Sequence, residues 1–194
     1  MFNTLRDYIN AYSASVISDE GFALVQQAFK HKKLRKRQYF LQEGDVCKYT
    51  AFIAKGAMRQ YTVDEEGHER IVRLGIENWW MGDFESFVML TPSMYNIDAF
   101  EDSDLLIITN EQMQNLRAQV PVMDNVIKMM DQKRAIAYEK RIRVSISYTA
   151  EDRYVDLQKT YPDLLQRFPQ NMIASYLGIS PETLSRIRKQ MMLR

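Results

Sequence analysis

The spacing of apolar side chains is helical at both ends of the chain and changes in the middle. Residues 2–30 repeat apolar positions at intervals of three and four, and Ser18 stands before two acidic residues, as a helix N-cap commonly does. We therefore predict helices over most of this segment. The basic run at 30–37 then begins an extended segment. We interpret its charges as a solvated strand edge, with a nucleic-acid patch as the alternative.

Short β-prone runs fill the segment from 38 to 110, and glycines separate them. Five of the seven glycines of the chain lie here at intervals of 7 to 12 residues: Gly44, Gly56, Gly67, Gly75 and Gly82. Evenly spaced turns between such runs are typical of an antiparallel barrel or sandwich. The sequence DEEG at 64–67 predicts a hairpin turn, and DLLIIT at 104–109 predicts the last strong strand.

The helical period returns after residue 111, and Pro121 stands near the start of a long periodic stretch that ends at about residue 147. The stretch could form a helix of about 25 residues, with a length of about 37 Å. Such a helix either lies on the barrel or pairs with its own copy as a coiled coil. We predict a dimer interface at Val126, Met129, Met130, Ile136 and Ala137.

The last 25 residues carry the signals of two helices joined by a short turn. Gly178 occupies the position at which a helix end favours a left-handed residue, Ser180 can cap the next helix, and Pro181 can start it. Ala174 is small where the two helices would cross. The apolar positions of this motif are Ile173, Leu177, Ile179, Leu184 and Ile187. The pattern predicts a helix-turn-helix, preceded by a helix at 150–161 and a bend at 162–170.

The second helix of this motif has two different faces. If Leu184, Ile187 and Met191 face the core, the opposite face presents Glu182, Ser185, Arg186 and Lys189. Arginine can bind the O6/N7 edge of guanine, and glutamate can accept a hydrogen bond from the amino group of cytosine. The residues suited to phosphate groups are Ser180, Thr183, Arg188, Lys189 and Arg194. DNA binding is favoured over an ordinary helical hairpin because the small residue, turn glycine, cap and apolar positions coincide.

The charge distribution agrees with this interpretation. The chain of 194 residues has a net charge of +1, but residues 1–131 carry −5 and residues 132–194 carry +6. A basic last third is typical of a surface for a polyanion, although clustering on solvated faces is the alternative. One cysteine, Cys47, allows no internal disulfide, and no apolar run approaches the roughly 18 residues of a membrane span. We expect a cytoplasmic protein without a membrane segment.

Four stretches carry a family resemblance: LQEGD, AKGAMRQY, WWMGDFESF and GISPETLSRIRK. With them the chain resembles, over nearly its whole length, the Crp/Fnr family of bacterial transcription regulators. The resemblance implies an α+β fold with three parts. Residues 1–118 form an antiparallel β-barrel of the cyclic-nucleotide-binding type (a jelly-roll or double-stranded β-helix) with N-terminal helices. Residues 119–148 form a dimerisation helix, and residues 149–194 form a helix-turn-helix domain.

The resemblance also implies residue roles and partners. Glu182 and Arg186 match the family's base-contacting pair, and Ser180 and Thr183 match phosphate-contacting positions. The implied partners are double-stranded DNA, a second copy of the chain, RNA polymerase and a small-molecule effector of unknown identity. Members of the family usually continue from the recognition helix into a hairpin wing, which we expect to be truncated here because the sequence ends at Arg194.

The effector region departs from the family pattern. Members that bind cyclic AMP have a cassette that starts Gly-Glu and ends Arg-Ser, and its arginine contacts the cyclic phosphate. The corresponding residues here are Gly82, Asp83, Phe84 and Glu85 at the start, and Ser93, Met94, Tyr95 and Asn96 at the end. Residues 74–116 contain eight acidic residues and no lysine or arginine.

A phosphate buried among these residues would cost several kcal/mol. We therefore predict that cyclic AMP is not the effector. We favour a pocket that is vestigial or that binds another ligand; the less favoured alternative is that Arg59, Arg70 or Arg73 reaches in from a neighbouring strand.

The sequence does not favour an iron–sulfur cluster, a metal site or a catalytic site. Cys47 alone cannot hold an iron–sulfur cluster, and His31 and His68 are too few for a metal-binding barrel enzyme. No catalytic triad is apparent. We expect no metal, no cofactor and no enzymatic activity. The interpretation is a sequence-specific DNA-binding regulator. The main alternative is a non-enzymatic sensor or scaffold that acts through protein contacts, and a barrel enzyme is the weaker one.

Overall fold

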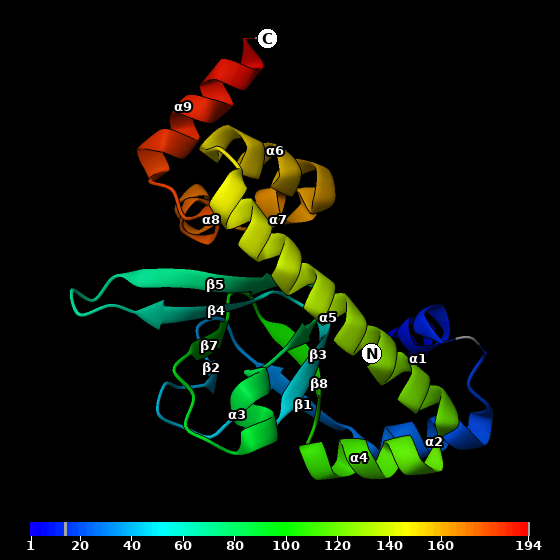
Figure 1. The fold of residues 1–194 in the computed structure, drawn as a ribbon. Coiled ribbons are helices and arrows are strands. Elements are labelled where there is room, and N and C mark those ends of the chain that lie inside the picture. Colours follow the sequence, from blue (N-terminus) through cyan, green and yellow to red (C-terminus); the bar gives the residue numbers. More distant parts are fainter. Residues whose placement is uncertain (14, 194) are drawn as a thin grey trace.

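The computed structural model describes residues 1–13 and 15–193, and Figure 1 shows a barrel with a long helix running across it. Two helices open the chain, α1 (Phe2–Tyr12) and α2 (Asp19–Ala28). The Ser18 hydroxyl accepts a hydrogen bond from the amide of Gly21 at 3.1 Å, so Ser18 caps α2 as predicted. Leu5, Ile9, Phe22 and Val25 turn their apolar side chains into a shared core.

The barrel consists of two antiparallel four-stranded sheets. The strands are β1 (Lys30–Leu34), β2 (Tyr39–Leu41), β3 (Thr50–Lys55), β4 (Met58–Val63), β5 (Glu69–Gly75), β6 (Trp80–Met81), β7 (Asn96–Ala99) and β8 (Ser103–Ile108). One sheet has the order β1-β8-β3-β6 and the other has the order β2-β7-β4-β5. A short helix, α3 (Phe84–Met89), lies between β6 and β7. The predicted α+β class with an antiparallel barrel is confirmed.

The barrel interior is apolar and its turns fall at the glycines. Ile53, Met58, Ile97 and Leu105 are completely buried between the two sheets. Gly67, with a φ of +83°, completes the turn between β4 and β5. This hairpin is the one that the DEEG sequence predicted. Such a φ is accessible to glycine at little cost, which explains its place in the turn.

Two helices follow the barrel, α4 (Asn110–Gln119) and α5 (Pro121–Ser147). The first turns of α5 pack with α1 and α4, where Met123 and Val126 are 1% exposed. From residue 131 onward α5 is largely exposed, including Ile136 at 65%, Ile142 at 61% and Ile146 at 78%. The long helix therefore has one half inside the core of the chain and one half with an unpartnered apolar surface.

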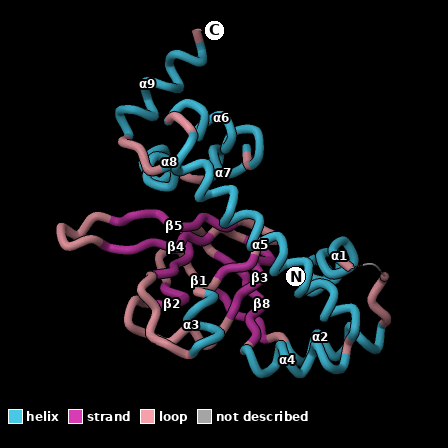
Figure 2. The backbone as a smooth tube through the Cα atoms, viewed as in Figure 1, coloured by secondary structure: helices cyan, strands magenta, loops and turns pink. Residues whose placement is uncertain are grey.

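Four helices end the chain: α6 (Ala150–Thr160), α7 (Pro162–Arg167), α8 (Gln170–Leu177) and α9 (Pro181–Met192). The segment predicted as a bend thus contains a short helix, α7, which starts at a proline. Figure 2 shows this helical group at one end of α5 and the N-terminal helices at the other end. No helix within residues 1–13 and 15–193 has both the length and the apolar character needed to cross a membrane.

Candidate nucleic-acid interface and ligand cavity

The turn between α8 and α9 has the geometry of a helix-turn-helix. Gly178 adopts a left-handed conformation with a φ of +68°, and the amide of Ile179 donates to the carbonyl of Ala174 at 3.0 Å. The Ser180 hydroxyl accepts a hydrogen bond from the amide of Thr183 at 3.2 Å, and Pro181 starts α9. These local contacts are the ones that the sequence signals predicted. They fix the direction in which α9 leaves the turn.

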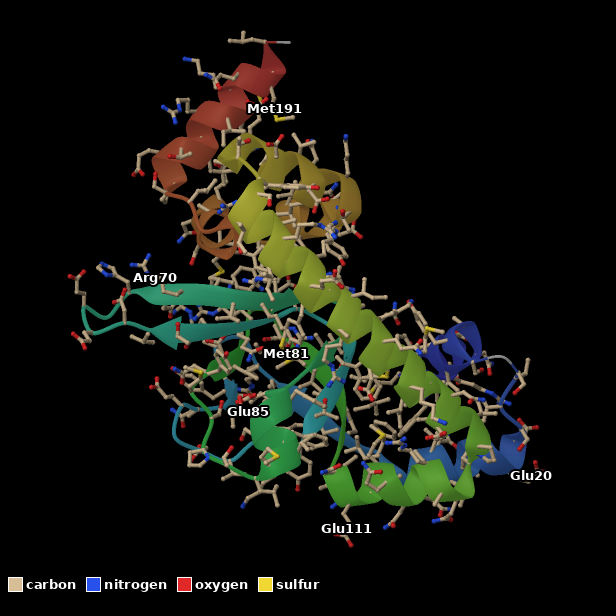
Figure 3. All side chains as sticks on the ribbon, viewed as in Figure 1. Glu20, Arg70, Met81, Glu85, Glu111 and Met191 are labelled. Carbon is tan, nitrogen blue, oxygen red and sulfur yellow. The ribbon has the colours of Figure 1, made fainter. Side chains whose placement is uncertain are left out.

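Burial separates the two faces of α9. Leu184 and Ile187 are buried in a core that also contains Tyr154 and Leu157 of α6, and Met191 is half-buried at the far end of the helix (Figure 3). The opposite face exposes Glu182, Ser185, Arg186 and Lys189. Thr183 and Arg188 are half-buried at its margins. Arg194 lies outside the described residues.

The exposed face of α9 has an uncompensated positive charge. Within the described part of the chain, Arg186, Arg188 and Lys189 form no ion pair. The amide of Glu182 itself and the Ser180 hydroxyl lower the pKa of the Glu182 carboxyl, which is therefore ionised at neutral pH. One carboxylate and several cations near a helix N-terminus can bind both phosphate oxygens and base edges.

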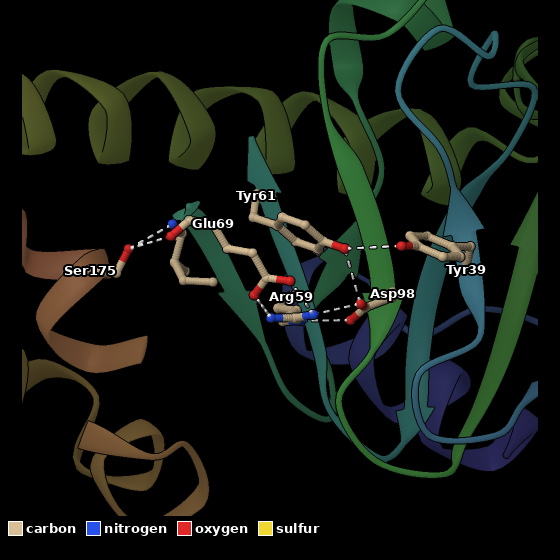
Figure 4. A network of polar contacts seen from close by, with 7 residues as sticks. Tyr39, Arg59, Tyr61, Glu69, Asp98 and Ser175 are labelled. Carbon is tan, nitrogen blue, oxygen red and sulfur yellow. Dashed lines mark hydrogen bonds and ion pairs between the residues drawn. The ribbon is translucent and has the colours of Figure 1, made fainter. Parts of the chain in front are cut away.

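The C-terminal helices α6 to α9 contact the barrel through α7 and α8. The Ser175 hydroxyl on α8 accepts a hydrogen bond from the amide of Ile71 on β5 at 2.9 Å (Figure 4). Arg167 on α7 pairs with Glu77 at 2.7 Å and with Glu101 at 2.8 Å. Leu74 of β5 lies in the same hydrophobic core as the C-terminal helices. These contacts hold α9 in one orientation relative to the barrel.

Arg167→Ala should lower the free energy of unfolding by about 1 kcal/mol at neutral pH, a figure discounted for solvent screening because the three side chains are 30–35% exposed. Burial raises the pKa of Glu77, but hydrogen bonds from Arg167 and from the amide of Gly56 outweigh it, so the pKa is lowered. The stabilisation is therefore present above the pKa of the unfolded carboxyl and is lost as the pH falls through the lowered folded value.

Urea unfolding of wild type and Arg167→Ala at several pH values tests this prediction. The difference between the two proteins should shrink below about pH 4. Arg70→Ala, which removes an exposed pair with Asp64 on the β4–β5 hairpin, is the matched control and should change stability little. Equal stability of wild type and Arg167→Ala at neutral pH would contradict the assignment of Arg167 as a domain contact.

A cavity of about 280 Å³ lies beneath α5, between α3, α4 and the barrel. Of the eight expected effector residues, Gly82, Asp83 and Phe84 border it. The other five do not: Glu85, Ser93, Met94, Tyr95 and Asn96. Asp83 caps α3 by accepting hydrogen bonds from the amides of Glu85 and Ser86, and the Ser93 hydroxyl donates to Asp83 at 2.7 Å. The side chains of Asp83 and Ser93 are therefore engaged within this segment.

The three candidate arginines have different surroundings. Arg59 donates to Asp98 at 2.8 Å and also pairs with Glu69 (Figure 4), and Arg70 pairs with Asp64 at 3.0 Å. Arg73 borders the cavity and donates to the backbone carbonyl of Trp80 at 2.7 Å. The favoured interpretation, in which no arginine reaches the pocket, is therefore wrong for Arg73. The basic-free stretch begins one residue after it, and β5 runs along the cavity.

The predicted dimer residues also divide into two groups. Val126 lies in the core with α1 and α4 and is not free for a partner, whereas Met130 is half-buried against the same core. Met129, Ile136 and Ala137 are exposed. The exposed apolar residues that the sequence reasoning missed are Ile142 and Ile146. Their spacing of four on a helix was the available signal.

The cysteine and the two histidines do not form a metal site among the described residues. Cys47 is buried, His31 pairs with Asp104 at 2.9 Å, and His68 lies on the β4–β5 hairpin. Residues 1–13 and 15–193 contain no group of three or more histidine, cysteine or acidic side chains that could hold a metal ion.

Comparison with known proteins agrees with the fold. Residues 31–120 match the family profile described as "Cyclic nucleotide-binding domain". No curated protein sequence matches the chain. The chain is similar to the solved structure of FixK2 from Bradyrhizobium japonicum, with a TM-score of 0.67 and 17% identity over 85% of each chain.

Two further structures are similar over most of their length. The c-di-GMP responsive global regulator CLP of Xanthomonas campestris has a TM-score of 0.65 and 14% identity, over 91% of this chain and 92% of that one. The catabolite activator protein of Thermus thermophilus has a TM-score of 0.57 and 19% identity, over 90% and 83%. Residues 31–120 thus form a domain of the cyclic-nucleotide-binding type, and the chain has the fold of Crp/Fnr regulators.

Proposed function

We propose that this protein is a non-enzymatic, sequence-specific DNA-binding transcription regulator of the Crp/Fnr type. The observation that carries the proposal is the exposed face of α9, where Arg186, Arg188 and Lys189 lack ion-pair partners in the described residues next to a capped helix N-terminus. Unpaired cations on one face of a helix repel one another, so their concentration there favours a surface for an anionic partner. The fold shared with FixK2 and CLP supports the same reading.

In this proposal α9 enters the major groove of DNA. Arg186 and Glu182 read base edges, and Ser185 is exposed on the same side of the helix. Lys189 and the half-buried Arg188 contact phosphates, while Ser180 and Thr183 present the N-terminus of α9 to the backbone. Transcription regulation implies RNA polymerase as a further partner.

The active form is a symmetric dimer that pairs the second halves of two α5 helices. The large exposed apolar residues of this half are Ile136, Tyr138, Ile142 and Ile146, and Met129 precedes them. Apolar side chains of this size on one helix stabilise a pair of helices when a second copy covers them. A two-fold dimer presents two α9 helices to half-sites about 34 Å apart.

Cyclic AMP bound by the cassette is not part of this proposal. Asp83 is engaged as the cap of α3, Ser93 stands at the position of the cassette arginine and is bonded to Asp83, and Met94 is exposed at the position of the cassette serine. A cyclic phosphate would lack its partner charge at this position.

Selection from a randomised double-stranded DNA library tests the proposal. The wild-type protein should enrich a two-fold symmetric sequence whose half-sites are centred about 10 base pairs apart. Recovery of no sequence above the random background would favour the alternative, a sensor or scaffold of the same fold that acts through protein contacts.

A further inference from the structure

Arg73 on β5 is a cation without a counter-charge. Its guanidinium donates to the carbonyl of Trp80 at 2.7 Å, and it forms no ion pair with any described carboxylate. Arg134 and Arg141 on α5 are close enough to act on it electrostatically, and burial together with these two cations lowers the pKa of Arg73. A partly buried charge in this position destabilises the ligand-free protein unless an anion neutralises it.

The acidic groups near Arg73 are already engaged. Asp83 accepts hydrogen bonds from the start of α3 and from Ser93. Asp131 pairs with Arg134 at 3.0 Å, and Arg134 also lies over the ring of Phe84 with its guanidinium carbon 3.8 Å from the ring centroid. The carboxylates at the cavity therefore have partners of their own, and Arg117 in its wall pairs with Asp124 at 2.7 Å. Among the described basic residues of the wall, Arg73 is the one without an ion pair.

The rest of the cavity wall is largely apolar. Its apolar lining residues include Trp80, Met81, Phe84, Phe87, Met113 and Ile127. The volume of about 280 Å³ lies just below the range of about 300–1,000 Å³ that is usual for ligand pockets. A cavity of this size suits a molecule of about one ring. An oxyanion group would meet Arg73, and the apolar body would cover the aromatic and methionine side chains.

We propose that the cavity beneath α5 binds a small organic anion, a carboxylate or phosphate on a single-ring apolar body, with Arg73 as the group that receives the oxyanion. The guanidinium can donate two parallel hydrogen bonds to either oxyanion. That this ligand regulates DNA binding rests on the proposed function, whereas its binding to the cavity does not.

The position of the cavity connects this ligand to α5. Met130 and Arg134 of α5 form one wall, and Arg73 of β5 forms another. Arg141, nearly two turns beyond Arg134 on α5, donates to the carbonyl of Val72 on the same strand as Arg73. A ligand that neutralises Arg73 removes the repulsion between β5 and the arginines of α5. It therefore favours the arrangement in which the two elements approach closely.

Calorimetry with defined probes tests binding on the full chain. Phenyl phosphate and benzoate carry the two oxyanions on one ring, and benzyl alcohol is the neutral control. We expect at least one anion to bind with a Kd of about 100 μM or tighter and benzyl alcohol not to bind. The stronger of the two anions identifies the oxyanion. Arg73→Gln should weaken that binding at least 10-fold, whereas Arg70→Gln, on the same strand but paired with Asp64, should leave it unchanged.

The melting temperatures of wild type and Arg73→Gln are also measured without ligand. Arg73→Gln should melt at the same temperature as wild type or higher, because it removes an uncompensated charge. If Arg73→Gln fails to fold, Arg73→Lys gives the same test, because it keeps the charge and loses the paired hydrogen bonds, and it should bind the anion more weakly.

Absence of binding by both anions below about 1 mM would overturn the proposal. Anion binding of equal strength in wild type and Arg73→Gln would overturn it too, as would cyclic AMP binding that survives this substitution. The DNA titration of the same protein is independent. Anion binding without sequence-specific DNA binding would refute the proposed function and leave this site standing, and the reverse result would refute the site alone.

Discussion

Ile136→Glu on α5 should convert a dimer into a monomer and weaken binding to a two-half-site DNA by about 100-fold or more. Ile136 is 65% exposed in the single chain, and its apolar surface lies in the half of α5 that packs against little of its own chain. A glutamate at this position faces its own copy across a two-fold axis, so each dimer gains two buried, repelling charges. Each monomer then binds one half-site and loses the effective concentration that the linked second site provides.

Light scattering at tens of micromolar protein, together with fluorescence anisotropy on labelled DNA, measures both effects. Met89→Glu on α3 is the matched control, because Met89 is apolar and 66% exposed but does not belong to α5. A wild-type protein that remains monomeric at this concentration would contradict the dimer. A variant that loses dimerisation while retaining full DNA affinity would contradict the proposed coupling between the two.

Arg186→Ala should cost roughly 1–3 kcal/mol at the preferred DNA site, or roughly 5- to 150-fold in affinity, and should relax specificity at one base pair. Arg186 lies on the exposed face of α9 without an ion-pair partner in the described chain, so its guanidinium is free to bind a guanine edge. The loss should be much smaller on DNA with a different base pair at that position.

Lys189→Ala is the comparison for Arg186→Ala, because Lys189 is one turn further along the same face. It should weaken binding to all sequences evenly and reduce the dependence of log affinity on log salt by about 1. Gel-shift titrations on a set of single-base variants of the site separate the two patterns. Equal losses on all sequences for Arg186→Ala would remove it from base reading.

The helix-turn-helix was predictable from sequence because its determinants are local. Ser180 caps a helix whose first residue is Pro181, and Gly178 ends the preceding helix in the conformation that glycine favours. Each signal acts within a few residues, so distant parts of the chain could not overrule it. The barrel was predictable for a similar reason, since glycine turns and alternating strands are also short-range features.

The dimer surface was predictable only in part. Val126 and Ile136 both belong to the apolar stripe of α5, and the stripe alone cannot say which of them the chain buries itself. Val126 packs against the core that α1 and α4 complete, whereas Ile136 lies beyond their reach. Burial of Val126 depends in part on α1, which lies more than 100 residues earlier in the chain, and residue spacing carries no information about such a contact.

The ligand cavity was the least predictable feature. The family pattern predicted an effector pocket formed by residues between Gly82 and Asn96. The cavity instead combines the start of that segment with Arg73 of β5 and Arg134 of α5. Because residues 74–116 contain no lysine or arginine, the sequence predicted a pocket without basic residues. The fold brings in basic residues from outside the window, because β5 and α5 border the same space.

The ratio of affinities for a selected DNA site and a scrambled site of equal length tests the central claim most directly. Both titrations are made with wild-type protein at about 150 mM salt, so that non-specific phosphate contacts contribute equally to each. A DNA-binding regulator should bind the selected site at least about 1,000-fold more tightly than the scrambled one. Equal affinities for the two DNA molecules would contradict the assignment of α9 as a sequence-reading helix.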